Sequence, residues 1–128
     1  MSSRAEATAV ETDEVVARIC RLPIDFYCGT KSMVQLVADS GIEAQPTALS
    51  VVNLTKYIGT NPEIVESWLR WSENKRVTSG WFFSRHGDRF DVGFYPKGKV
   101  LAFSEPTVAC AEFIVREVEI LRAIRPQK

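Results

Sequence analysis

The chain has 128 residues, of which 45% are hydrophobic and 25% are charged, and its 16 basic side chains balance its 16 acidic ones. This length predicts a single domain spanning residues 1–128, and the composition is that of a globular chain, which excludes general disorder. The neutral total removes the main argument for general binding to nucleic acid or to an anionic membrane, which needs an excess of Lys and Arg.

Cysteine usage and hydropathy predict a cytoplasmic protein. The three cysteines, Cys20, Cys28 and Cys110, are an odd number, which argues against a disulfide framework and for a reducing compartment. Residues 1–10 hold no apolar run, so we expect no signal peptide. No stretch approaches the ~18 consecutive apolar residues of a membrane span, so we expect no membrane contact.

The first part of the chain predicts a disordered tail (residues 1–11) and then a mainly helical region (residues 12–75). We expect Pro23 to end the first helix, and an irregular aromatic segment to follow it at residues 24–29. The predicted helix starts are residues that cap a helix or tolerate its first turn: Thr12, Thr30, Pro46 and the pair Asn61 and Pro62.

From residue 78 the hydrophobic period falls towards two, which predicts a three-stranded antiparallel meander over residues 78–103. Gly93 inside a strand indicates a bulge or a close backbone approach. A C-terminal helix is predicted over residues 105–124. We expect Phe94 of the meander and Val118 of this helix to be buried between the two elements. The fold class is therefore α+β, with the N-terminal helices and the C-terminal helix packed on the meander.

The residues that carry chemistry form no recognisable catalytic or metal-binding pattern, so we expect no enzyme activity, no metal and no cofactor. His86 is the only histidine, and its neighbours Gly87 and Asp88 indicate a polar turn between strands. The cysteines lack the short spacing of zinc ligands. Cys28 is the thiol that we expect to be most open to reaction.

Residues 32–58 support an alternative function as a DNA-binding regulator. They hold an apolar helical pattern, a glycine at Gly41 and a second predicted helix, which is typical of a helix-turn-helix motif. The second helix carries a single cation, Lys56, where a recognition helix normally presents several donors. Nucleic acid is therefore not the expected partner.

Residues 68–81 hold three tryptophans, two adjacent cations and a glycine at a predicted helix-to-strand junction. Trp and Arg are frequent among the residues that anchor protein interfaces. We expect Trp68 to be core. For the rest we predict a partner-binding surface built from the helix end and the neighbouring strands: Trp71, Lys75, Arg76, Trp81, Arg89, Asp91 and Tyr95.

This run resembles the C-terminal half of small bacterial immunity proteins, together with two further stretches at residues 92–98 (Val92, Gly93, Phe94, Tyr95, Pro96 and Gly98) and 109–114. Immunity proteins are cytosolic antitoxins made beside secreted polymorphic or contact-dependent toxins. The resemblance implies a small non-catalytic protein that neutralises a cognate toxin domain by direct binding.

Overall fold

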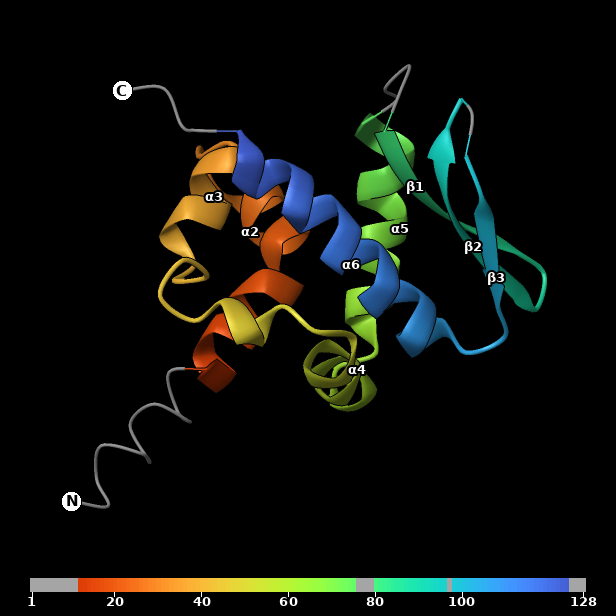
Figure 1. Ribbon diagram of the computed structural model, residues 1–128, viewed down its shortest axis with the longest axis horizontal. Helices are drawn as coiled ribbons and strands as arrows, with labels where there is room; N and C mark the ends of the chain where they lie inside the picture. The colour runs from red at the N-terminus through yellow and green to blue at the C-terminus, as the bar shows by residue number, and fades with distance from the viewer. Residues whose placement is uncertain (1–11, 76–79, 97, 125–128) are drawn as a thin grey trace.

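The computed structural model describes residues 12–75, 80–96 and 98–124, and the predicted tail lies outside them. Its architecture is α+β, with the helices on one side of a three-stranded antiparallel sheet (Figure 1), which confirms the predicted fold class. Residues 12–20 are helical. The elements that follow in chain order are α2 (Leu22–Cys28), α3 (Met33–Asp39), the 3-10 turn η1 (Pro46–Ala48), α4 (Val51–Thr60), α5 (Glu63–Lys75), β1 (Gly80–His86), β2 (Arg89–Tyr95), β3 (Val100–Phe103) and α6 (Pro106–Ala123).

The N-terminal helices differ from the prediction at Pro23. The first helix gives way to a turn at Arg21, and Pro23 lies in the first turn of α2 instead of ending a helix. Proline is tolerated there because the N–H groups of a first turn have no partner within the helix. The segment that was predicted to be irregular is therefore mostly helical, and it exposes Tyr27 and Cys28.

Serine hydroxyls cap the next two α-helices. The N–H of Gln35 donates to Ser32 Oγ at 3.1 Å, so α3 begins after Ser32 and not after the predicted Thr30. Ser50 plays the same part for α4, while the predicted start at Pro46 opens only the short η1 turn. In each case the hydroxyl is the acceptor that a first-turn N–H lacks within its own helix. The predicted start of α5 at Asn61 and Pro62 is correct to within a residue.

The sheet is the predicted meander, with strand order β1-β2-β3. Gly87 allows the tight turn between the first two strands, because its φ of 62° is one that other residues rarely adopt. Cross-strand pairing of Val92 with Phe83 and with Leu101 places these residues on the inner face, towards the helices. The alternate residues form the outer face, which no helix covers in Figure 1.

Aromatic rings join the sheet to the helices. The ring of Phe113 on α6 stacks on that of Phe83 with centroids 5.6 Å apart, and it meets Trp68 of α5 edge to face at 5.8 Å. Trp68 is fully buried, and its indole N–H donates to the carbonyl oxygen of Cys20 at 2.8 Å. The prediction that Trp68 belongs to the core is confirmed.

Phe94 is less central than the sequence predicted. It is only half-buried, and its ring meets Trp81 edge to face at 5.3 Å, whereas Val118 is fully buried. The deeply buried inner-face positions are Phe83, Phe90 and Val92. Strand alternation places a residue on the correct face, but it does not tell how far along the strand the helical cover extends.

Helix α6 connects the sheet with the N-terminal helices. It crosses from the sheet towards α3 in Figure 1, and it contacts all three strands as well as α3, α4 and α5. Its buried side chains include Phe113, Ile114 and Val118, which recur at helical spacing. The β-meander and the helical half are therefore joined by α6, which reaches all three strands, and by the packing of α5 on β1.

The outer edge of β1 is covered by α5. The two elements lie side by side, and the N–H of Phe83 donates to Ser72 Oγ at 2.7 Å. The hydroxyl of a helix thus satisfies a strand donor that would otherwise face outward.

Candidate protein-binding surfaces

The structure describes six of the seven residues of the predicted partner-binding surface, and it divides them among separate places. Trp71 and Lys75 point inward, where the Trp71 indole N–H donates to Glu117 Oε2 at 2.9 Å and Lys75 Nζ lies 2.8 Å from Glu117 Oε1. The side chains of Lys75 and Glu117 are only 10% and 6% exposed. These groups therefore offer little surface to a partner. Arg76 lies outside the described residues.

Trp81 lies at the margin of the inner sheet face, half-buried. The guanidinium of Arg116 lies over its ring, 4.6 Å from the centroid, and Glu112 pairs with Arg116 at 2.7 Å. Two concavities of about 490 and 340 Å³ share Trp81 and Arg116 in their linings. Trp81 thus remains accessible from a hollow beside α6.

Arg89, Asp91 and Tyr95 lie on the outer face of the sheet, on one side of β2 as strand alternation requires. Tyr95 is 55% exposed. Trp81 pairs with Phe94 across the strands, whereas Tyr95 pairs with Gly80, so Trp81 and Tyr95 belong to opposite faces. The structure does not bring the predicted residues onto one surface.

The outer face also places a serine, a histidine and an aspartate together. Ser84 Oγ lies 3.1 Å from His86 Nε2, and Asp91 Oδ2 lies 3.7 Å from the same nitrogen. In a Ser-His-Asp triad the carboxylate holds one ring nitrogen and the hydroxyl faces the other. Here both groups face Nε2, so Asp91 cannot orient His86 while His86 takes a proton from Ser84. Arg89 donates to both carboxylate oxygens of Asp91, from Nε to Oδ1 at 3.0 Å and from Nη2 to Oδ2 at 3.2 Å.

The three cysteine thiols differ in their exposure to solvent. Cys20 and Cys110 are fully buried, and burial raises the pKa of the Cys20 thiol to about 12 and the pKa of the Cys110 thiol well above its ordinary value. Cys28 is exposed. In the part of the chain that the structure describes, no three His, Cys, Asp or Glu side chains lie close enough to hold a metal ion.

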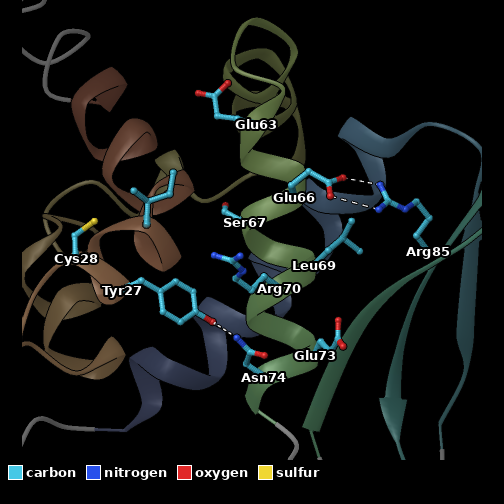
Figure 2. Close-up of a pocket in the computed structure, with 11 residues that line it drawn as sticks. Tyr27, Cys28, Glu63, Glu66, Ser67, Leu69, Arg70, Glu73, Asn74 and Arg85 are labelled. Atoms are coloured by element: carbon cyan, nitrogen blue, oxygen red, sulfur yellow. Dashed lines mark hydrogen bonds and ion pairs between the residues drawn. The ribbon is translucent and has the colours of Figure 1, made fainter.

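A wide hollow with a volume of about 770 Å³ lies along α5. We call it the α5 trough. Figure 2 shows α5 running through it, with α2 on one side and β1 on the other. Eleven residues from these three elements line it: Ile24, Tyr27, Cys28, Glu63, Glu66, Ser67, Leu69, Arg70, Glu73, Asn74 and Arg85.

The polar side chains of the α5 trough are held in defined positions. Glu66 pairs with Arg85 of β1 at 2.5 Å, and Asn74 Nδ2 donates to the Tyr27 hydroxyl at 2.8 Å. The guanidinium of Arg70 lies 5.9 Å from the centroid of the Tyr27 ring. These contacts connect α5 to α2 on one side and to β1 on the other.

The sequence did not predict this trough, because one of its walls is α2. Pro23 was expected to end the first helix, so α2 was not predicted. The exposed polar face of α5 carried a usable signal: Glu63, Glu66, Arg70 and Glu73 recur at intervals of three and four residues. Arg85 is brought to Glu66 only by the packing of β1 on α5.

The segment that suggested a helix-turn-helix motif folds differently. Residues 40–50, including η1, separate α3 from α4, whereas the motif needs a turn of about three or four residues. The spacing that favoured DNA binding is therefore absent from this segment.

No helix in the described ranges combines the length and the apolar character that a membrane crossing requires. Comparisons of this chain with models of protein families, with curated proteins and with solved structures find no match.

Proposed function

We propose that this chain is a non-catalytic binding protein that blocks a partner protein by direct contact, and that it acts as an immunity protein towards a toxin domain. The observation that carries the proposal is the α5 trough, a wide hollow between α2, α5 and β1 that is lined by an aromatic ring, apolar side chains and charges. Interfaces combine these groups because rigid aromatics give contact area at little cost in entropy, and charges fix the partner.

The other features of the described residues fit this proposal. The Ser84, His86 and Asp91 cluster has the wrong geometry for a proton relay, and two of the three thiols are buried. The resemblance to immunity proteins suggests that the partner is a toxin domain, which is inhibited when this chain binds over it. The partner thus docks on the trough and is released unmodified.

The test is photo-crosslinking in the cells that make this protein. A benzophenone amino acid replaces Tyr27 in the α5 trough, Tyr95 on the outer sheet face, or Ile120, which lines the hollow beside α6. We expect one protein to be captured from Tyr27 and not from the other two positions. That protein should arrest growth when it is expressed alone, and co-expression of this chain should restore growth.

Two results would contradict the proposal. Capture from Tyr95 or Ile120 alone would place the interface outside the trough. Capture of nucleic acid would favour the regulator that residues 32–58 suggested.

A further inference from the structure

The charged side chains of the α5 trough are one ion pair, one cation beside an aromatic ring and two exposed carboxylates. Arg85 is paired with Glu66, and Arg70 lies over the Tyr27 ring. Glu63 and Glu73 also line the trough and are exposed, and neither forms an ion pair with any described residue. Arg70 keeps its charge, so the trough holds three carboxylates against two guanidiniums, and its net charge is negative.

The two open carboxylates have a fixed separation. Their positions are ten residues apart on α5, and a helix rises 1.5 Å per residue, so they are about 15 Å apart along the axis. They share one face of α5 with Glu66 and Arg70, because all four fall at intervals of three, four or ten residues. Between them, Ile24, Leu69 and the Tyr27 ring provide apolar surface.

We infer that the α5 trough takes a basic segment of the partner protein, which carries two Lys or Arg side chains about 15 Å apart with an apolar side chain between them. The inference rests on the proposed function and specifies its partner. On a helix this spacing corresponds to about ten or eleven residues, and on an extended segment to about four or five. The apolar side chain contacts Ile24 and Leu69 while the two cations meet Glu63 and Glu73.

Charge complementarity selects this occupant over others. A nucleic acid or an acidic peptide would place its own negative charge against two unpaired carboxylates. An apolar helix would leave these carboxylates without partners at the edge of the contact.

The experiment is a selection of random 16-residue peptides on the purified full chain. The selected peptides are then titrated against two variants. Glu63→Lys/Glu73→Lys reverses the two open charges, whereas Asp13→Lys/Asp88→Lys makes the same change in net charge at exposed carboxylates that do not line the trough. A third variant, Glu63→Gln/Glu73→Gln, removes the charges without adding new ones, and circular dichroism checks that each variant folds.

We expect the selected peptides to carry an excess of Lys and Arg at the stated spacing. Their affinity should fall roughly tenfold or more for the charge-reversed trough, less for the neutral variant, and little for the control, because each exposed pair contributes up to about 1 kcal/mol. Raising the salt concentration should weaken binding to the parent.

Selected peptides without excess cations, equal affinity for both double Lys variants, or a selection that yields no binder would each overturn the inference. The proposed function is judged separately by crosslinking from Tyr27. Capture of a protein there together with a failed peptide selection would show that the trough binds a partner through a different chemistry.

Discussion

Glu117 brings a carboxylate into the interior between α5 and α6. Its oxygens are shared by the Lys75 ammonium and the Trp71 indole N–H, and the ammonium also lies 5.6 Å from the centroid of the Phe113 ring. A buried pair of charges is stable only while both members and their hydrogen bonds are present, because each charge has lost its water. The cluster is therefore sensitive to the loss of one member.

We expect Glu117→Ala to destabilise the protein by about 3–5 kcal/mol in denaturant melts, because the Lys75 ammonium is left buried without a partner. Glu119→Ala, an exposed position on the same helix, should cost less than about 0.5 kcal/mol. Adding Lys75→Met to Glu117→Ala should restore part of the loss. Equal costs for Glu117→Ala and Glu119→Ala would show that the pair contributes nothing to stability.

The residue scale also shows what the sequence could not predict. Trp71 and Lys75 were predicted to be anchors for a partner, since Trp and Lys at a helix end look the same whether they face outward or inward. Their orientation depends on Glu117, which lies three and four residues from the core positions Ile114 and Phe113. The sequence did contain one indication of this buried ion pair, a carboxylate at a position spaced like the core residues of its helix. It could not show which cation pairs with Glu117, because that cation lies on another helix.

At the scale of the elements, the strand pattern was the most predictable part. Alternation placed the three strands and their inner face correctly, because one face of a sheet must be buried. The helices before residue 40 were harder, since a proline is compatible both with the end of a helix and with the first turn of the next one. Because Pro23 was expected to end a helix, the sequence-based prediction lacked α2, which forms one wall of the α5 trough.

Gly93 lies inside β2, and the structure shows which side chains lie close to it. A Cβ on Gly93 would lie 2.7 Å from the Phe82 ring and 3.1 Å from the Val100 side chain, so the close neighbours on the outer face are side chains, and the strand pairing continues through Gly93 without a bulge. Gly93→Ala should cost about 1–3 kcal/mol in thermal or chemical unfolding, because the ring must move.

The matched control is Gly59→Ala in α4, where an added Cβ meets no atom within 4 Å. It should stabilise the protein by up to about 1 kcal/mol, since alanine restricts the unfolded chain and favours the helix. If Gly93→Ala were as benign as Gly59→Ala, the Phe82 ring would not be fixed on the sheet.

At the scale of the whole molecule, α6 joins the two halves, and its contact with the sheet is centred on Phe113. Seven of the residues that carry the resemblance to immunity proteins are fully buried: Trp68, Val92, Ala109, Cys110, Ala111, Phe113 and Ile114. These seven residues specify packing. Four other residues of the run 68–81 line the α5 trough, where a partner would dock: Leu69, Arg70, Glu73 and Asn74.

Phe113→Ala should destabilise the protein by about 3–5 kcal/mol, because it removes a ring that packs on both Phe83 and Trp68. Phe94→Ala should cost less, about 1–2 kcal/mol, because this ring is only half-buried. Chemical denaturation followed by Trp fluorescence measures both. A larger loss for Phe94 than for Phe113 would place the centre of the core at the end of β2.

The Ser72 hydroxyl that covers the edge of β1 has a consequence for assembly. A sheet polymerises only when both of its edges can recruit another strand, since growth needs a receiving edge at each added unit. Here α5 closes one edge and leaves β3, a strand of four residues, as the other. Strand pairing between two copies through β3 would consume the open edge of both, so it would stop at a pair and could not continue into a fibre.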